Sequence, residues 1–238
     1  MSQANPWRSV ARTDIGKVRA RNEDAFLDCP QRGLWAVADG MGGHQCGDVA
    51  SQLIVTHLGE LPEVGSFDER VIAVRQCLHW LNRRMGQELT ITPERRDSIM
   101  GSTVVALLIE GNRGACVWAG DSRCYLLREG HVHQLTRDHS VMEQLIEDQK
   151  MSLEQACEQP NARALTRAIG GRDPLSLEVM ELEVFPSDVF LLCSDGFYQG
   201  LDNHVSRDTL SIESLPTLFD DVLRGEALDN LTAVVVSQ

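Results

Sequence analysis

The chain has 238 residues, of which 42% are hydrophobic and 24% charged, and this fits one or at most two compact globular domains. It carries 22 lysines and arginines against 35 aspartates and glutamates, a formal net charge of −13. A surface this acidic repels phosphate backbones and anionic membranes unless the basic residues are segregated, so nucleic acid is disfavoured as a partner.

Short runs rich in valine, leucine, alanine and aromatic residues predict at least nine β-strands. In chain order they cover residues 7–11, 25–29, 34–38, 103–109, 115–119, 124–127, 177–182, 189–193 and 231–236. Amphipathic periodicity predicts helices over residues 49–61 and 71–85, and further helices over residues 141–149, 152–158 and 212–223. Because the strands come in clusters rather than alternating with helices, the pattern favours layered antiparallel sheets with helices outside.

No repeat, low-complexity tract or Pro/Ser-rich linker divides the chain, so we expect a single domain over residues 1–238. The first residues lack the apolar segment of a secretory signal, and no apolar stretch approaches the roughly 20 residues of a membrane helix. Seven cysteines, odd in number and without a Cys-x-x-Cys pair, suit a reducing compartment better than a disulfide framework or a zinc site. We expect a cytoplasmic monomer with no membrane partner.

One local pattern occurs three times: an apolar run, one or two small residues, then an aspartate followed by glycine or serine. The aspartates are Asp39, Asp121 and Asp195, and a fourth, Asp229, precedes the last predicted strand. A lone Asp-Gly is usually a turn. Several carboxylates gathered at one rim of a sheet would repel each other unless cations intervened. Oxygen ligands suit Mg²⁺ or Mn²⁺, and a glycine after the aspartate leaves its carbonyl accessible as a further ligand.

A second group of charges stands directly before the strand predicted at residues 25–29. Arg19 precedes two adjacent acids, Glu23 and Asp24. By itself this is a charged turn. Beside a divalent-metal cluster, however, the two acids become possible ligands of a metal or of its bound water. The guanidinium can then bind phosphate oxygens bidentately.

Seven short motifs follow one another between residues 12 and 236. They are Arg19-x-x-Asn22-Glu23-Asp24, Asp39-Gly40-Met41-Gly42-Gly43-His44, Gly120-Asp121-Ser122-Arg123, Leu135-Thr136-Arg137-Asp138-His139-Ser140, Leu165-Thr166-Arg167-Ala168-Ile169-Gly170, Ser194-Asp195-Gly196 and Asp229-Asn230-Leu231-Thr232. In this order they resemble the motifs of the PP2C-type (PPM), metal-dependent serine/threonine protein phosphatases. The sequence Met41-Gly42-Gly43-His44 resembles that of the bacterial single-domain branch. Each motif alone is weak evidence, but seven in the family's order are not expected by chance.

The resemblance implies an α+β fold, a four-layer α-β-β-α sandwich of two central antiparallel sheets flanked by helices. It also implies two core Mn²⁺ or Mg²⁺ ions and a third, weaker ion. The metal ligands it implies are Glu23, Asp24, Asp39, Gly40, Asp121, Asp195 and Asp229. Within that set Asp39 would bridge the two core ions, and Asp121 with Asp195 would hold the third.

The function implied by the resemblance is hydrolysis of phosphoserine and phosphothreonine in proteins, which reverses serine/threonine kinase signalling in a bacterium. We expect attack by a metal-bridging water or hydroxide while Arg19 clamps the substrate phosphate. Eukaryotic-type members carry a histidine where this chain has Met41, and many bacterial members carry one in the flap where it has Gln159. His44 or a metal-bound water is therefore the candidate general acid. Residues Val141 to Arg163 are expected to form a flap that affects substrate choice.

Two other functions compete with this one. A cysteine-dependent phosphatase needs Cys-x5-Arg, which occurs at Cys77 to Arg83 and at Cys157 to Arg163, but neither segment has the glycines that wrap amides around phosphate. The other is a catalytically weak module of the same fold that binds phosphoproteins for regulation. Such a module would be recognised by the loss of a metal-bridging ligand. Asp39, Asp195 and Asp229 are all present, which favours the enzyme.

Overall fold

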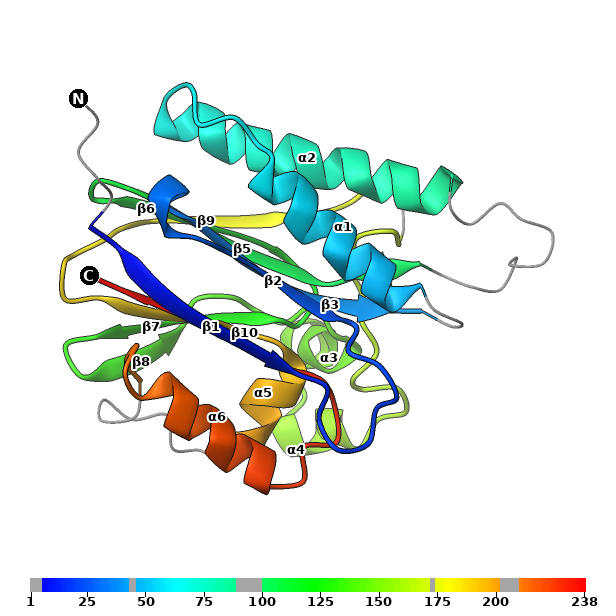
Figure 1. Cartoon of the computed structure of the whole chain (residues 1–238). Coiled ribbons are helices and arrows are strands. Elements are labelled where there is room, and N and C mark those ends of the chain that lie inside the picture. Colours follow the sequence, from blue (N-terminus) through cyan, green and yellow to red (C-terminus); the bar gives the residue numbers. More distant parts are fainter. Residues whose placement is uncertain (1–5, 43–45, 89–99, 172–173, 202–209) are drawn as a thin grey trace.

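The computed structural model describes residues 6–42, 46–88, 100–171, 174–201 and 210–238 (Figure 1). These residues form two antiparallel sheets. In spatial order the first sheet contains β1 (Arg8–Asp14), β11 (Leu231–Ser237), β10 (Val189–Cys193), β7 (Arg123–Arg128) and β8 (His131–Gln134). The second contains β2 (Asp24–Cys29), β3 (Leu34–Met41), β5 (Val104–Glu110), β6 (Arg113–Ala119) and β9 (Glu178–Glu183), with the short β4 (Gly101–Ser102) paired to the end of β3.

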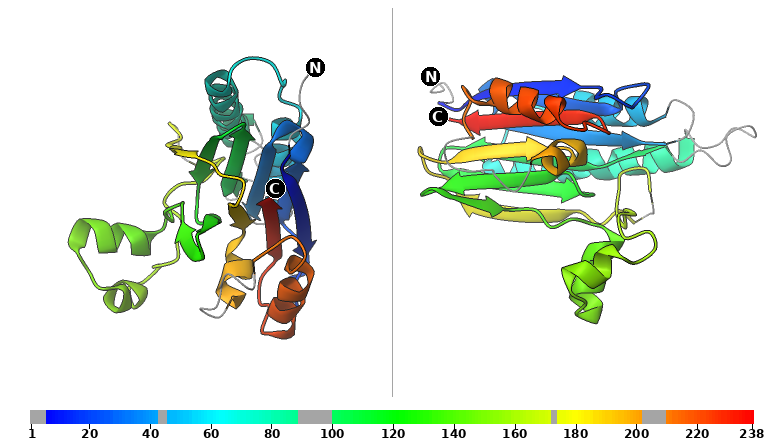
Figure 2. Two further views of the ribbon diagram at one scale, coloured as in Figure 1. Left: turned by 90° about the vertical axis from the view of Figure 1, so that its left-hand side faces the viewer. Right: turned by 90° about the horizontal axis from the view of Figure 1, so that it is seen from below.

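Helices cover both outer faces of this pair of sheets (Figure 1). On the second sheet lie α1 (Gly47–Gly59) and α2 (Phe67–Glu88), and on the first sheet lie α5 (Asp195–Gly200) and α6 (Leu215–Arg224). Two further helices, α3 (Val141–Gln149) and α4 (Leu153–Cys157), project from the body of the sandwich (Figure 2). A single 3-10 turn, η1 (Pro30–Arg32), precedes β3.

The hydrophobic core has three layers, one at each junction of the sandwich. The second sheet shows why. In β3, Ala36 and Ala38 pack toward α1 and α2, whereas Trp35 and Val37 pack toward the other sheet. Because side chains alternate along a strand, a strand covered on both faces must be apolar at nearly every position. This explains the continuous apolar runs of the central strands.

The expected α+β four-layer sandwich is confirmed, and each predicted strand overlaps an observed one. Sequence reasoning missed the two-residue β4, the polar edge strand β8 and the short α5, and it placed the start of α2 four residues too late. The single-domain interpretation stays a prediction. No helix in the described parts of the chain is long and apolar enough to cross a membrane.

Candidate active site

A cleft of about 300 Å³ lies where the end of β3 meets the residues that follow β10 and precede β11. It is lined by Arg19, Glu23, Asp39, Gly40, Met41, Gly42, Thr103, Asp121, Arg163, Leu165, Asp195, Asp229 and Asn230. The structure therefore brings together seven of the predicted site residues: Arg19, Glu23, Asp39, Gly40, Asp121, Asp195 and Asp229. His44 lies outside the described residues.

The cleft carboxylates come from segments that are far apart in the sequence. Asp121 lies in the turn between β6 and β7, and Glu23 lies in the loop between β1 and β2. Both of these connections pass from one sheet to the other. Asp229 lies just before β11, and Asp195 is the first residue of α5, directly after β10. Asp39 was expected after the end of its strand, but it lies inside β3, which continues to Met41.

Strand register places two of the acids in the gap between the sheets. Asp24 and Asp39 are direct partners in the β2–β3 ladder. Side chains alternate along a strand, so both carboxylates continue the inter-sheet face that Phe26 and Val37 form further along. The two acids therefore stand where the inter-sheet core ends and the cleft begins.

Ser194 holds Asp24 from the opposite sheet. Its hydroxyl donates a 2.8 Å hydrogen bond to Asp24 Oδ2 and accepts one of 3.0 Å from the backbone amide of Thr232. Asn22 Oδ1 accepts a bond from the Asp24 amide at 3.1 Å. The role of Ser194 could not be predicted from the sequence, because its contact with Asp24 joins positions 170 residues apart.

Asp24 does not line the cleft but lies opposite Asp39 in the strand ladder, and the acids of this group repel one another. Burial, with added repulsion from neighbouring carboxylates, raises the pKa of Asp24 to about 7 and that of Asp121 to about 7. Burial raises the pKa of Asp39 as well, and the charges of Asp24 and Asp195 add to this effect. The pKa of Asp195 is raised by burial and then by the charge of Asp229.

This donor set fits a hard divalent cation, because it consists of oxygen atoms and because bound positive charge would relieve the repulsion. The side chains share one cleft, but no group of three or more His, Cys, Asp or Glu residues in the described chain is arranged to hold a metal ion. Asp229 is engaged with a cationic side chain instead: Arg19 Nη2 donates to its Oδ2 at 2.6 Å, and this bond raises the pKa of Arg19.

Asn230 fixes the loop that carries Arg19 and Glu23. Its Oδ1 accepts a 2.8 Å bond from the Glu23 amide, and its Nδ2 donates to the carbonyls of Ile15 and Arg21 at 2.9 Å each. One side chain at the start of β11 therefore holds both ends of that loop. Nothing in the sequence around Asn230 indicates these contacts.

The backbone at Asp39 and Gly40 is held closely on two sides. The Asp39 amide donates to Thr103 Oγ1 at 3.0 Å, and its carbonyl accepts bonds from Ser102 Oγ at 2.9 Å and from the Thr103 amide at 2.8 Å. A Cβ on Gly40 would lie 2.0 Å from the carbonyl oxygen of Gly47 at the start of α1. Gly40 is therefore required for this close approach of β3 to α1, independently of whether its carbonyl binds a metal ion.

Arg123 and the motif from Leu135 to Ser140 support the site rather than line it. Arg123 makes a bidentate pair with the nearly buried Asp138, with distances of 2.8 and 2.6 Å, and lies 3.7 Å over the ring of Tyr198 on α5. His139 Nδ1 accepts a 3.1 Å bond from the Gly120 amide, directly before Asp121. These contacts hold α5 and the Asp121 turn beside each other.

The segment from Val141 to Arg163 contains the projecting helices α3 and α4 (Figure 2). Ser140 caps α3 through the Glu143 amide at 3.2 Å, and Ser152 with Gln155 forms a capping box on α4. Only Arg163 of this segment lines the cleft, and it donates to Gln199 of α5 at 3.3 Å. Gln159 instead donates to the backbone of Gln155 at 3.3 Å on the projection itself.

The cysteines do not form a nucleophilic site. Cys77 and Arg83 both lie within α2, and burial raises the pKa of the Cys77 thiol to about 11. Cys157 is exposed at the end of α4, and its sulfur lies 3.4 Å from Met142 Sδ. Neither thiol lines the cleft, so the geometry does not support cysteine-dependent catalysis.

Comparison with known proteins agrees with the motifs. The sequence profile described as Protein phosphatase 2C matches residues 9–209. The chain is 34% identical over 96% of its length to the serine/threonine protein phosphatase PstP of Mycobacterium tuberculosis, of which it covers 44%. The chain therefore spans less than half the length of PstP. It belongs to the protein phosphatase 2C family.

Solved structures of the family share the fold. One, described as PppA, a key regulatory component of T6SS in Pseudomonas aeruginosa, is 42% identical with a TM-score of 0.88, and the match covers 98% of each chain. Another, the catalytic domain of PstP in complex with 2 manganese ions, is 34% identical with a TM-score of 0.78, and the match covers 97% of each chain. The protein phosphatase 2C resemblance inferred from the seven motifs is thereby confirmed.

Proposed function

We propose that this chain hydrolyses phosphoserine and phosphothreonine in proteins with the help of Mn²⁺ or Mg²⁺. The observation that carries the proposal is the cleft in which Asp39, Asp121, Asp195 and Asp229 face one another beside the guanidinium of Arg19. Family membership, and the manganese ions named for the related PstP domain, support it. A cleft of repelling carboxylates is suited to cations, and an arginine beside cations is suited to phosphate.

In this proposal two ions would be held by Asp39, the Gly40 carbonyl, Asp195, Asp229, Glu23 and Asp24, and a third would be held by Asp121 with Asp195. When bound, such ions polarise phosphoryl oxygens and make a water acidic enough to attack phosphorus at neutral pH. Asp24 is supported by Ser194 at 2.8 Å, which fixes the direction of its carboxylate. Such a bond holds a ligand in position without itself contacting the ion.

Arg19 binds the substrate phosphate. Its side chain is 54% exposed and its Nη2 contacts Asp229 at 2.6 Å. Because the pair is exposed to solvent, the guanidinium can exchange the Asp229 carboxylate for a phosphate group at little cost in free energy. Its fork then holds two phosphoryl oxygens in line for attack. Binding the phosphate also frees Asp229 to serve as a ligand.

The leaving serine or threonine alkoxide must gain a proton, and we assign this step to His44 or to a bound water. Phosphoserine has a poor leaving group, whereas p-nitrophenyl phosphate has a good one that needs little protonation. His44→Ala should therefore slow phosphoserine hydrolysis more than p-nitrophenyl phosphate hydrolysis. If His44→Ala hydrolyses both substrates as fast as the parent does, His44 is excluded as the general acid.

The physiological substrate is a phosphoprotein made by a serine/threonine kinase, and we place the reaction in the cytoplasm, carried out by a monomer without nucleic acid or membrane partners. PppA is described as a key regulatory component of T6SS, and the match covers 98% of both chains. Phosphoproteins of such a system are thus the first substrates to test. Phosphoproteomics of a strain lacking the gene would identify them.

A direct test of the chemistry uses p-nitrophenyl phosphate and Mn²⁺, before and after EDTA and after thiol alkylation. We expect EDTA to abolish turnover, added Mn²⁺ to restore it, and alkylation to spare it. The reverse pattern would favour a cysteine nucleophile. No metal-dependent turnover by the parent protein would favour the alternative function, a phosphoprotein-binding regulatory module.

A further inference from the structure

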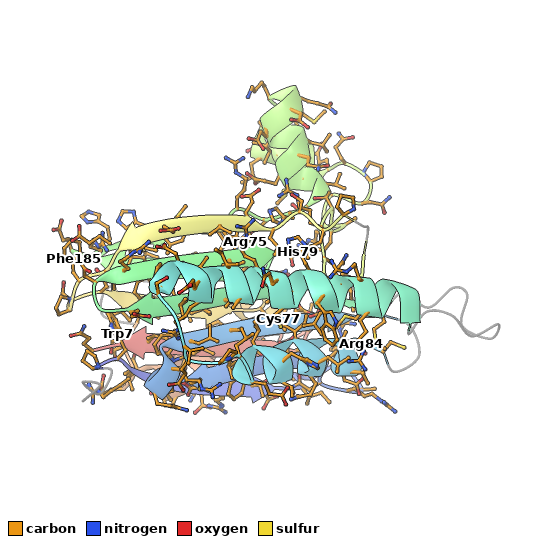
Figure 3. The ribbon with its side chains drawn as sticks, turned by 90° about the horizontal axis from the view of Figure 1, so that it is seen from above. Trp7, Arg75, Cys77, His79, Arg84 and Phe185 are labelled. Atoms are coloured by element: carbon orange, nitrogen blue, oxygen red, sulfur yellow. The ribbon has the colours of Figure 1, made fainter. Side chains whose placement is uncertain are left out.

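Helix α2 carries a basic stripe, defined as Arg75, His79 and Arg83, on the outer surface of the sandwich. Residues 70–87 contain four arginines and one histidine but no aspartate or glutamate, in a chain with net charge −13. The three residues of the stripe are four positions apart, so they follow one face of the helix. Figure 3 shows Arg75 and His79 on the side of α2 that faces β9 and the flap, with Cys77 and Arg84 on the side of α1.

Two arginines close to the stripe pair with acids, whereas Arg75 and Arg83 do not within the described residues. Arg70, at the start of the same helix, pairs with Glu110 at 2.8 Å, and Arg113 on β6 pairs with Asp68 and Glu181 at 2.7 and 2.9 Å. Arg75 and Arg83 are both exposed, and neither contacts a carboxylate within the described residues. The glutamates nearest in the edge strand β9 are already engaged: Glu181 bonds Arg113, and Glu178 bonds Arg167.

Helix stability does not explain the stripe. Neither arginine of the stripe has an aspartate or glutamate three or four positions away on the helix, and the helix dipole favours cations only in the last turn. The last turn of α2 has no basic residue, and Arg75 lies near the middle of the helix. The stripe is therefore better explained by something that binds it than by the folding of α2.

Apolar side chains accompany the charges. Ile72 is 47% exposed and Trp80 is 41% exposed on the same helix. Arg84 lies 5.1 Å from the Trp80 ring centroid and holds that ring beside α1. A surface that combines unpaired cations with large apolar groups resembles the composition of protein interfaces, where arginine and tryptophan are enriched.

We infer that the basic stripe of α2, with Ile72 beside it and Trp80 at the edge that contacts His57 of α1, is a docking surface for an acidic segment of a protein partner. Its length supports a short segment: eight residues of helix rise about 12 Å. That span matches carboxylates at positions i, i+4 and i+8 of an acidic helix. A long polyanion such as DNA would extend beyond the stripe onto an acidic surface and be repelled.

The stripe lies close to the segment that leaves the flap. Buried Asn82, one residue before Arg83, accepts a 2.9 Å hydrogen bond from the amide of Gly170, and Ile169 bridges to Ser102 of β4. A partner docked on α2 would therefore sit beside the flap and outside the catalytic cleft. The docking surface does not depend on the proposed hydrolysis, and its test needs no turnover.

The test measures fluorescence anisotropy of a labelled helical peptide of about 16 residues, with glutamates at i, i+4 and i+8 and leucines beside them. A second peptide has glutamine in place of each glutamate. The variant is Arg75→Glu with Arg83→Glu. The matched control is Arg8→Glu with Arg224→Glu, which changes the net charge equally at exposed arginines on β1 and α6. Circular dichroism melts establish that each protein folds. If the Arg75→Glu, Arg83→Glu variant does not fold, Arg75→Gln with Arg83→Gln replaces it.

We expect the acidic peptide to bind the parent and to lose at least about 10-fold in affinity in the α2 variant but less than about 2-fold in the control. Raising NaCl from about 50 to about 300 mM should weaken this binding, because screening shortens the reach of the charges. Absence of binding, or equal losses in both double variants, overturns the proposal. Stripe-dependent binding of an oligonucleotide or of phosphatidylserine vesicles, without peptide binding, overturns it as well.

Discussion

Ser194 and Asp24 are joined by a 2.8 Å hydrogen bond that links the end of β10 in one sheet to the start of β2 in the other. The bond crosses the gap between the sheets at the point where the cleft opens. The Ser194 amide also donates to the carbonyl of Thr232 at 3.0 Å. Ser194 thus fixes an acid of one sheet relative to the backbone of the other.

Ser194→Ala should weaken Mn²⁺ binding by about 10- to 100-fold, the usual cost of losing a residue that orients a metal ligand. At saturating Mn²⁺ the maximal rate should change little, because the ligands themselves remain. Titration of activity against Mn²⁺ measures both quantities. Ser187→Ala, at an exposed turn, is the control, and an unchanged Mn²⁺ requirement in Ser194→Ala would contradict the positioning role.

Asp39→Asn should make the metal-free protein more stable. Burial and the charges of Asp24, Asp195, Asp121 and Asp229 all raise the pKa of Asp39, so an uncharged amide at this position removes repulsion from the folded state. A gain of ~1 kcal/mol would raise the melting temperature by roughly 2–4 °C in a chain of this size. Melting in EDTA measures the effect, and a lower melting temperature than that of the parent would contradict it.

The stability of the metal-free protein should fall as pH rises from about 4 to about 7. Asp24 and Asp121 have folded-state pKa values of about 7, well above the ordinary aspartate value. Between these limits the folded state keeps protons that the unfolded state has released, so a higher pH favours unfolding. Mn²⁺ should reverse the trend, because it binds the deprotonated carboxylates.

Urea denaturation in EDTA at about pH 5 and about pH 7.5 measures this effect as a change in unfolding free energy. Other groups also titrate in this range, so the comparison is made between the parent and Asp121→Asn. The fall in stability should be smaller in the variant. An equal fall in both proteins would show that Asp121 is not ionising as its environment indicates.

Arg19→Ala should raise the KM for phosphate monoesters and weaken inhibition by inorganic phosphate. The loss of a charge-assisted hydrogen bond is worth about 1.5–3 kcal/mol, or roughly 10- to 150-fold in kcat/KM. Arg19→Lys should recover part of this, since an ammonium keeps the charge but loses the bidentate fork. Unchanged phosphate inhibition in Arg19→Ala would exclude the phosphate clamp.

The fold was predictable from the sequence where burial is two-sided. β3, β5 and β11 are covered on both faces, and their nearly continuous apolar runs predict strands. The edge strand β8 reads His-Val-His-Gln, with one apolar residue among four, and carries no such signal. The six-residue helix α5 begins at Asp195, and the Asp195-Gly196 pair is as typical of a turn as of a helix start.

The site was predictable where a carboxylate follows an apolar run, as at Asp39 and Asp195. The groups that hold these acids were not, because Ser194, Thr103 and Asn230 act through partners between 64 and 207 residues away in sequence. Nothing local distinguishes such a serine from one on the surface. Their roles follow from strand register and from the packing of one sheet on the other.

The most direct measurement of the central claim is hydrolysis of a phosphoserine or phosphothreonine peptide as a function of Mn²⁺, in the parent and in Asp39→Asn. We expect saturable, EDTA-sensitive release of phosphate by the parent and a loss on the order of 10³-fold in the variant. The folded state of the variant is verified by its melting temperature. Full activity of Asp39→Asn, or turnover by the parent that persists in EDTA, would contradict metal-dependent catalysis in the carboxylate cleft.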